Sequence, residues 1–591
     1  MCGILGVSGS SIPEKVIFKN ALNVLKHRGP DAQLFCNPTA SLILGHTRLS
    51  IVDYENNLSN QPMIDDQSGN VLIFNGEIYN YKELRKYINE HDLKTKSDTE
   101  VLLKLLTHLG VKKTLPLLNG MWAFSFYDAS AGTVTLSRDR TGKKPLFFTK
   151  LGNNTVAFSS EAKSLFLLGK KPEINHNAII NFLFERTVGS NGESFFESIE
   201  SIPPGSYVNF DHKSPSIKNF ESYWDFPHTN TCKLSYLDAV DEFKEIFTSA
   251  VTMRFSDEVP FAVLVSGGLD SSSIASVVGE NVDREIMAIS AIYPGYPLDE
   301  SKYAEEVISK YPNLKKNFIT IDSSRFSDGI DKTIIHQETP VADGSMVAHR
   351  LLMEEIHSGG IRVVLSGNGG DEVLAGYQHN MVPAMILEAW RHPDFKNLNK
   401  SDLLRALYYV LPNRIKRKIK QYDYSSTGLI NNNKVLDGIY DRYSTKSKHQ
   451  SIVNSNLISF ITHWSLPGFN WYEDRNAMAN NIEARAPFQD YRIIDFLLSC
   501  PGKYKIDYEW TKKILRDSMK DTIPDSVRLR KDKQGFYAPI NDWEEMIDYE
   551  FIHDLDFLQS FPYLVLNDLP NKHFNYRWRI FVIYRWFKLF F

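Results

Sequence analysis

The second residue of the chain, Cys2, has both the atom and the position to act as a covalent nucleophile. Glycine follows it, and removal of Met1 would leave a thiol and a free α-amine on one residue. Such an amine, with an ordinary pKa of about 7.7–8, can take the proton from its own nucleophile. The alternative is a buried structural cysteine, the commonest role of a free thiol. Cys2 alone leaves both interpretations open.

A glycine turn between an apolar run and a row of serines occupies residues 262–273, AVLVSGGLDSSS. Glycines let backbone N–H groups converge on an anion, and a helix N-terminus adds free donors. The pattern predicts a buried strand, a phosphate-binding turn and a helix, without the GK[ST] of a Walker loop. Asp270 within such a turn is best explained as a Mg²⁺ ligand. An ordinary strand–turn–helix corner is the alternative.

A second glycine turn with an acidic pair, SGNGGDE, occupies residues 366–372 after another apolar run. Asp270 and Asp371 from the two turns could share one or two Mg²⁺ ions on a triphosphate. Two unrelated turns are the alternative. Among the cations that follow, Lys512 is the candidate for the charge that an adenylation transition state requires.

The elements that must position these residues differ between the two halves of the chain. Apolar runs at 286–292, 317–321 and 361–365 alternate with helical patterns, which predicts an α/β half with a doubly wound parallel sheet. Its ligand should lie beyond the carboxyl ends of the strands. In the first half, segments 121–128 and 133–137 alternate as antiparallel strands, and residues 81–91 predict a helix.

Two polar positions of the first half could complete a site around Cys2. Asn75-Gly76 is a strong hairpin signal, but the Asn75 amide and the Gly76 N–H could instead form an oxyanion hole. Asp98 lies in the capping sequence of a helix expected at 101–109 and is a candidate ligand for a substrate amine.

Composition excludes several classes of function. The chain has 591 residues, a formal net charge of −4 and 42% hydrophobic residues, which predicts a globular protein with two or more cores and no nucleic-acid partner. The four cysteines are scattered without a CxxC pair, and neither a long apolar run nor a signal-peptide layout is present. We therefore expect a cytoplasmic protein without a transmembrane segment.

The first half resembles a class II glutamine amidotransferase domain, of the N-terminal nucleophile type. The segments that carry the resemblance, in order, are MCGI, HRGPD, HTRLSIVD, NGEIYN, SDTE, GMWAFSFYD, RDRTGKKPL and FSSEAKSL. The resemblance implies an α+β fold with two antiparallel sheets and helices outside, in which Cys2 attacks the glutamine amide and releases ammonia through a thioester. It assigns Arg48 to the glutamine α-carboxylate, Glu77 and Asp98 to its α-ammonium, Asn75 and Gly76 to the oxyanion hole, and Leu49 and Val52 to the glutamine pocket.

The second half resembles the synthetase domain of the asparagine synthetase family, of the ATP-pyrophosphatase type. The matching segments are SGGLDSSS, SGNGGDE, EARAPF, KKILRD and RKDKQGF. The resemblance implies that ATP activates a carboxylate as acyl-AMP and that ammonia, crossing between the domains through a tunnel, displaces AMP. It assigns Asp270 and Asp371 to Mg²⁺ and Lys512 to the adenylation transition state. The residues it assigns to ATP are Val265, Ser266, Gly267, Gly268, Asp270, Ser271, Ile289, Ser366 and Gly367.

One residue departs from the family pattern. Asparagine synthetases generally carry an acidic residue at the third position of the second turn, where this chain has Asn368. An amide cannot act as a base or hold a cation by its charge. Aspartate is the default acceptor by the resemblance. Another carboxylate, such as a sugar uronic acid, is the alternative, and a non-catalytic paralogue is a third hypothesis.

The domain limits expected from these patterns are 1–226 for the glutaminase domain and 235–591 for the synthetase domain. The tail, residues 574–591, is rich in aromatic and basic residues at helical spacing. It predicts a helix docked on its own domain, with binding to a membrane surface as the alternative. Only small-molecule substrates are expected as partners, and a homodimer is left open.

Overall fold

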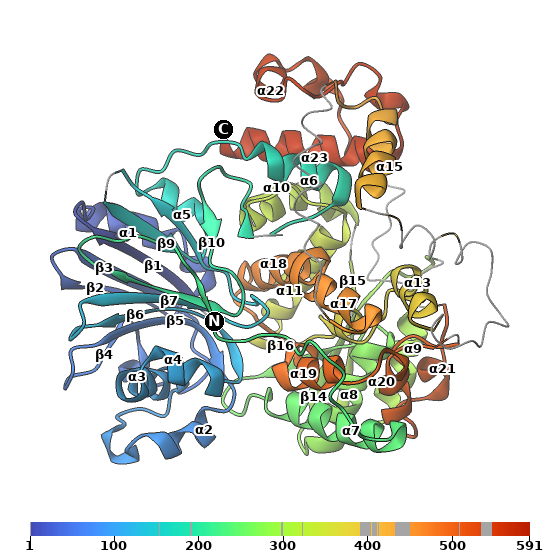
Figure 1. Ribbon diagram of the computed structural model, residues 1–591, viewed down its shortest axis with the longest axis horizontal. Helices are drawn as coiled ribbons and strands as arrows, with labels where there is room; N and C mark the ends of the chain where they lie inside the picture. Colours follow the sequence, from blue (N-terminus) through green and yellow to red (C-terminus); the bar gives the residue numbers. More distant parts are fainter. Residues whose placement is uncertain are drawn as a thin grey trace.

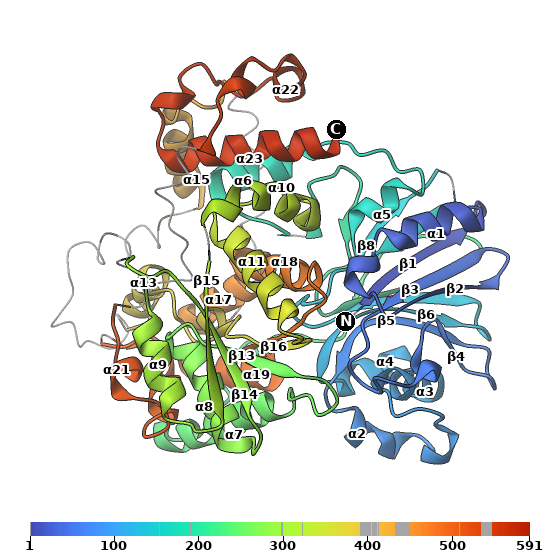
Figure 2. The ribbon, with the colours of Figure 1, turned by 180° about the vertical axis from the view of Figure 1, so that it is seen from behind.

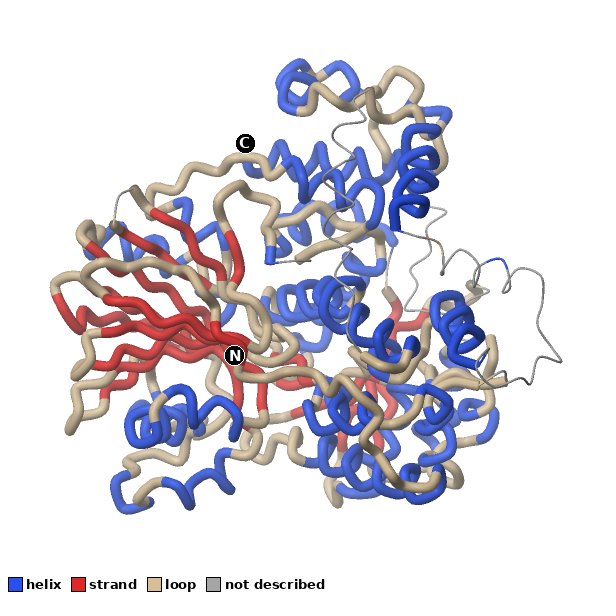
Figure 3. The backbone as a smooth tube through the Cα atoms, viewed as in Figure 1, coloured by secondary structure: helices blue, strands red, loops and turns tan. Residues whose placement is uncertain are grey.

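A computed structural model gives the fold of the protein. It describes residues 2–152, 154–189, 192–296, 299–321, 323–389, 404, 411, 413–431, 449–507, 509–532 and 546–591. Two groups of strands lie side by side, a larger antiparallel group and a smaller one enclosed by helices (Figures 1 and 3). The first group belongs to the N-terminal part of the chain and the second to the C-terminal part, as the sequence predicts.

The N-terminal half contains two six-stranded antiparallel sheets, with strand orders β10-β8-β9-β1-β3-β2 and β12-β11-β7-β6-β5-β4. Alternate residues of the strands face opposite sides, so that Ile4 and Ile73 pack between the sheets while Leu5 and Phe74 face the helices outside. The strands are β1 (Cys2–Gly9), β2 (Ala32–Thr39), β3 (Leu42–Arg48), β4 (Met63–Ile64), β5 (Val71–Ile78), β6 (Gly120–Asp128), β7 (Thr133–Arg138), β8 (Phe147–Lys150), β9 (Thr155–Ser159), β10 (Glu200–Ser201), β11 (Ser206–Asp211) and β12 (Glu221–Ser222).

The helices outside the two sheets lie on opposite sides of the sandwich (Figure 1). Helices α1 (Lys15–Asn23) and α5 (Ala162–Phe166) cover the sheet that contains β1. Helix α3 (Asp98–Leu109) covers the sheet that contains β5 and is capped by Ser97, whose Oγ accepts a hydrogen bond from the Glu100 nitrogen.

In this half, the hairpin alternative for Asn75-Gly76 and one local prediction are wrong. Asn75-Gly76 is no hairpin turn, because both residues lie within β5, where Gly76 is opposite Trp122. A Cβ on Gly76 would lie 2.0 Å from the Met121 carbonyl oxygen, so the glycine permits close approach of two strands. The helix expected at 81–91 is broken into α2 (Tyr81–Leu84) and two 3₁₀ turns (Arg85–Tyr87 and Glu90–Asp92), because Ile88 between the turns is extended.

The C-terminal half is built on a five-stranded parallel sheet with the order β15-β14-β13-β16-β17. Its strands are β13 (Phe261–Leu264), β14 (Ile286–Ile292), β15 (Leu314–Thr320), β16 (Val363–Leu365) and β17 (Glu483–Arg485). Ala262 packs in a core with helices α10 (Phe326–Gln337) and α11 (Ser345–Ser358). Val263 packs in a second core with α7 (Tyr236–Thr252) and α8 (Leu269–Asn281). Helices thus cover both faces, which confirms the doubly wound α/β prediction.

The tail forms helix α23 (Phe574–Phe590), which packs against α6 (His176–Glu185) and α10 (Figure 2). The indole nitrogens of Trp578 and Trp586 donate hydrogen bonds to the carbonyl oxygens of Val341 and Glu338. The helix is therefore docked on the body of the protein. Across the described residues, no helix combines the length and apolar character that a membrane crossing requires.

Candidate active site

The first cluster of predicted residues surrounds Cys2, at the start of β1 and opposite Arg48 of β3. The Cys2 backbone nitrogen donates a hydrogen bond to Asn75 Oδ1 at 3.1 Å. Asn75 Nδ2 is buried and has no hydrogen-bond partner within the described chain. Leaving a buried N–H donor without a partner costs folding free energy, which a ligand oxygen can recover by accepting a hydrogen bond. This N–H group is therefore available to an oxyanion that develops beside Cys2.

A narrow cavity of about 30 Å³ opens beside the Cys2 side chain. Predicted residues that line it are Cys2, Arg48, Leu49, Val52, Gly76, Glu77 and Asp98. Lining residues that the sequence reasoning missed are Ile51, Ser59, Gln61, Phe74, Ser97 and Thr99. Several of the missed residues directly flank a predicted one, and that proximity in sequence was the only signal for them.

The charged groups of this cavity already have partners in the protein. The Arg48 guanidinium donates to the carbonyl oxygens of Asn56 and Asp53, each at 3.0 Å, and so holds the loop that follows β3. Glu77 forms a buried ion pair with Arg485 of the C-terminal half. Asp98 Oδ2 accepts a hydrogen bond from the Ile78 nitrogen at 2.9 Å, and burial raises the pKa of Asp98 to about 6.

Burial also raises the pKa of the Cys2 thiol above its ordinary value. A neutral thiol is a weak nucleophile, so the group needs a base to take its proton. The free α-amine that Cys2 would carry without Met1 is such a base.

The second cluster lies at the carboxyl ends of β13, β14 and β16. The turn after β13 leads into α8, as predicted, and Gly267 has a φ of 77° that favours glycine. The Ser266 nitrogen donates to Ser271 Oγ at 3.1 Å, which closes the turn. The Val265 nitrogen donates to the Ile289 carbonyl at 2.8 Å, so these two predicted residues are adjacent.

Lys512 joins the two acidic residues of the glycine turns. Its Nζ lies 2.5 Å from Asp270 Oδ2 and 2.5 Å from Asp371 Oδ1, and its side chain is buried. The turns are in contact, because a Cβ on Gly370 would lie 2.6 Å from Asp270 Cγ. The two carboxylates therefore converge on one point, as expected for residues at the ends of neighbouring parallel strands.

These two carboxylates also suit Mg²⁺. This ion is usually held by one or two carboxylates together with substrate phosphates and water. No cluster of three or more histidine, cysteine or acidic side chains able to hold a metal occurs in the described ranges. Asp270 and Asp371 could supply the two protein carboxylates of such a site, and a bound Mg²⁺ would neutralise phosphate charge on a nucleotide.

Buried ion pairs connect the two halves between these clusters. Arg28 Nε donates to the Cys2 carbonyl oxygen at 3.1 Å, and its Nη2 contacts Asp474 at 2.8 Å. Lys144 contacts the same carboxylate at 2.9 Å. Asp474 lies on α18 (Leu466–Met478) of the C-terminal half, so Arg28 links the strand that carries the thiol to that half.

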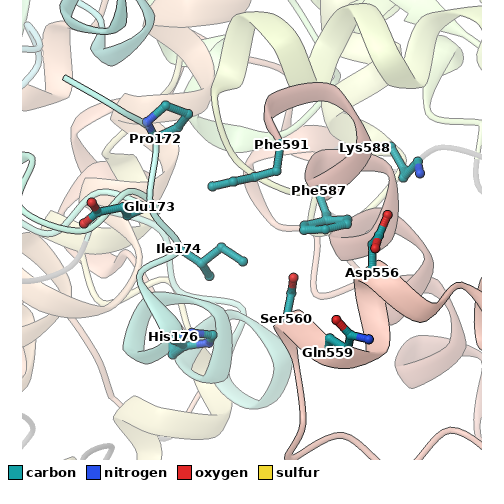
Figure 4. Close-up of a pocket in the computed structure, with 10 residues that line it drawn as sticks. All are labelled: Pro172, Glu173, Ile174, His176, Asp556, Gln559, Ser560, Phe587, Lys588 and Phe591. Atoms are coloured by element: carbon teal, nitrogen blue, oxygen red, sulfur yellow. The ribbon is translucent and has the colours of Figure 1, made fainter. Parts of the chain in front are cut away.

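The Asn368 side chain lies against a carboxylate that sequence reasoning missed. Asn368 Nδ2 donates to Glu473 Oε2 at 2.9 Å, and Glu473 also lies on α18. Of the motif RKDKQGF, residues 533–536 lie outside the described residues. A separate open pocket of about 790 Å³, between α23 and residues 172–176, contains none of the predicted site residues (Figure 4).

The comparisons with known proteins agree with this arrangement. Residues 1–224 match the model of the glutamine amidotransferase domain, and residues 242–556 match that of asparagine synthase. The chain belongs to the asparagine synthase family. It is 27% identical over 569 residues to asparagine synthetase [glutamine-hydrolyzing] 1 of Bacillus subtilis, which covers 92% of this chain and 88% of that protein. It is 25% identical over 588 residues to Amidase chry2 of Gibberella zeae, which covers 89% and 85%.

Membership of the asparagine synthase family identifies the class of reaction. The chain is a ligase for glutamine-dependent amidation, and the family uses ATP as a co-substrate. The two antiparallel sheets and the parallel sheet with its helices agree with the two matched domains.

Proposed function

We propose that the protein hydrolyses glutamine at Cys2 and uses the ammonia to amidate a carboxylate that ATP has activated as acyl-AMP. The observation that carries this proposal is the convergence of Asp270, Asp371 and Lys512 at the strand ends of the parallel sheet. Pyrophosphate release that requires both ATP and a carboxylate tests it directly.

In the glutaminase reaction, the Cys2 thiol attacks the glutamine amide carbon while its α-amine takes the thiol proton. The Asn75 Nδ2 and Gly76 N–H groups stabilise the oxyanion. Asn75 Nδ2, which has no hydrogen-bond partner among the described residues, supports this role. Arg48, Glu77, Asp98, Leu49 and Val52 bind the substrate glutamine.

In the synthetase reaction, the turn after β13 holds the pyrophosphate part of ATP. Its residues in that role are Ser266, Gly267, Gly268 and Ser271, while Val265 and Ile289 flank the adenosine, and Ser366 and Gly367 contact the nucleotide. Asp270 and Asp371 would hold Mg²⁺, which neutralises phosphate charge when bound. Lys512 stabilises the charge that develops during adenylation.

Aspartate is the default acceptor, and another carboxylate such as a sugar uronic acid is the second candidate. Similarity to asparagine synthetases favours aspartate, whereas Asn368 and the similarity to a relative named an amidase favour another carboxylate. The deciding experiment measures pyrophosphate release from ATP and glutamine with aspartate and with a panel of hexuronates. Release with a hexuronate but not with aspartate would reject the asparagine reaction.

A non-catalytic paralogue is rejected if the purified protein hydrolyses glutamine and the Cys2→Ala variant does not. Unchanged hydrolysis in that variant would instead reject the role of Cys2. The domain limits 1–226 and 235–591 and a cytoplasmic location belong to the same proposal. Sedimentation of the purified protein tests whether it forms a homodimer.

A further inference from the structure

Glu473 lies where the second glycine turn meets the glutaminase half. Its Oε1 accepts a hydrogen bond from Ser366 Oγ at 2.5 Å, and its Oε2 accepts one from Asn368 Nδ2 at 2.9 Å. Lys143, from the N-terminal half, forms an ion pair with Oε2. Glu473 is 8% exposed and Lys143 is 3% exposed, so this is a buried charge pair between the two halves.

The residue that follows Glu473 on α18 contacts the thiol strand. Asp474 accepts a hydrogen bond from Arg28, and Arg28 in turn donates one to the Cys2 carbonyl oxygen. Consecutive residues of one helix thus contact the turn that carries Asn368 and the group that holds the strand of Cys2. Glu473 therefore lies on the side of the nucleotide turn from which ammonia would arrive.

The amide-forming step needs a proton acceptor at this place. Attack of ammonia on an acyl adenylate leaves a positive charge on the nitrogen, and one N–H proton must be lost to give the neutral amide. Asn368 cannot take that proton, because an amide oxygen is too weak a base. A fixed carboxylate can both stabilise the cationic nitrogen and accept the proton.

Glu473 is held in the ionised form that this role requires. Burial opposes ionisation, but the Lys143 ammonium and the hydrogen bonds from Ser366 and Asn368 hold the pKa of Glu473 below its ordinary value. These contacts also fix the direction of the carboxylate.

We propose that Glu473 is the catalytic carboxylate of amide formation and that Lys143 and Asn368 position it. This inference rests on the proposed function. The nitrogen lone pair forms the C–N bond, one N–H proton passes to Glu473, and the C–O bond to AMP breaks with its electron pair leaving on AMP. Glu473 then releases the proton to solvent.

The test separates the partial reactions in the Glu473→Gln variant of the full chain. We expect glutamate release from glutamine and acceptor-dependent ATP–pyrophosphate exchange within about threefold of wild type. Amide formation from saturating ammonium should fall at least about 100-fold, the usual size of a lost general base. In the same background, Asn368→Glu should restore amide formation at least about tenfold, because it returns a carboxylate to the turn.

The matched control is Glu338→Gln. Glu338 is another buried carboxylate that forms an ion pair with α18, its Oε2 lying 2.8 Å from Arg475 Nη1. This variant should leave the ratio of amide formation to pyrophosphate exchange unchanged. If circular dichroism shows that Glu473→Gln does not fold, the double variant Glu473→Gln, Lys143→Met gives the same test. It removes both buried charges, so that the Lys143 ammonium is not left buried without its partner.

Two results would overturn the inference, and they are distinguishable. If Glu473→Gln forms amide within threefold of an active wild type, Glu473 has no part in the step. If the wild type exchanges no pyrophosphate with any carboxylate, the proposed function fails and the role of Glu473 fails with it. A loss confined to amide formation supports the inference.

Discussion

Asn75 Oδ1 accepts a hydrogen bond from the backbone nitrogen of Cys2 at 3.1 Å. The other end of the same amide, Nδ2, is buried without a partner among the described residues. One side chain thus holds the backbone of Cys2 and also carries an N–H donor that has no partner in the described part of the chain. The arrangement suits a group that becomes fully bonded only when an oxyanion forms.

Asn75→Ala should therefore lower glutamine hydrolysis about 10²- to 10³-fold, the usual cost of one oxyanion-hole donor. The measurement is glutamate release at saturating glutamine. Synthesis of amide from added ammonium is the control and should be retained, because it bypasses this site. Hydrolysis at the wild-type rate would rule out an oxyanion role for Asn75.

Asp270→Asn should reduce pyrophosphate release at least about tenfold and raise the Mg²⁺ concentration needed for half-maximal rate. The substitution replaces one of the two convergent carboxylates by an uncharged amide, which weakens the site because Mg²⁺ is held mainly by carboxylate charge. A titration of Mg²⁺ at fixed ATP measures the change, and glutamine hydrolysis serves as the control. Full activity with an unchanged Mg²⁺ requirement would contradict the metal role.

Glutamine binding should weaken in acid because the pKa of Asp98 is about 6. Above that pH the carboxylate is charged and, in its proposed role, would attract the α-ammonium of glutamine, whereas below it the group is neutral. Between pH 7 and pH 5 we expect the Kd to rise about tenfold, one decade per pH unit below the pKa. Calorimetry on the Cys2→Ala variant measures binding without turnover.

The matched variant for this pH dependence is Asp98→Asn in the same Cys2→Ala background. It should bind glutamine weakly at every pH and lack the dependence between pH 5 and 7. If the Kd for glutamine changes equally with pH with and without Asp98→Asn, the titrating group is not Asp98.

Trp586→Ala should destabilise the protein by about 3–5 kcal/mol, the usual cost of truncating a fully buried aromatic side chain. Trp586 is 0% exposed, and its indole nitrogen donates to the Glu338 carbonyl oxygen. Urea denaturation followed by fluorescence measures the loss. Phe591→Ala at the end of the chain, 47% exposed, is the control and should cost under about 1 kcal/mol.

The parts of the fold that the sequence predicted well depend on local patterns. The strand, the glycine turn and the start of the serine-rich helix around Ser266 appear as predicted. The hydrophobic periodicity of a strand and the conformational freedom of glycine are both properties of a few neighbouring residues, so the sequence shows them directly. At Asn75-Gly76, by contrast, the local pattern favoured a hairpin, the alternative to the oxyanion hole, and no hairpin forms. There, pairing with β6 along the whole strand outweighs the turn preference of the dipeptide.

The sequence by itself determined the nucleophile candidate, both glycine turns and their acidic residues, because each is defined by near neighbours. Only the tertiary structure decided which distant groups meet. Lys512 lies 242 residues from Asp270 in the chain, and Glu473 lies 105 residues from Asn368, yet each pair is within hydrogen-bond distance. No local pattern marks Glu473, since its role depends on how α18 packs between the two halves. That packing brings together charges that are stable in a buried site only as partners of one another.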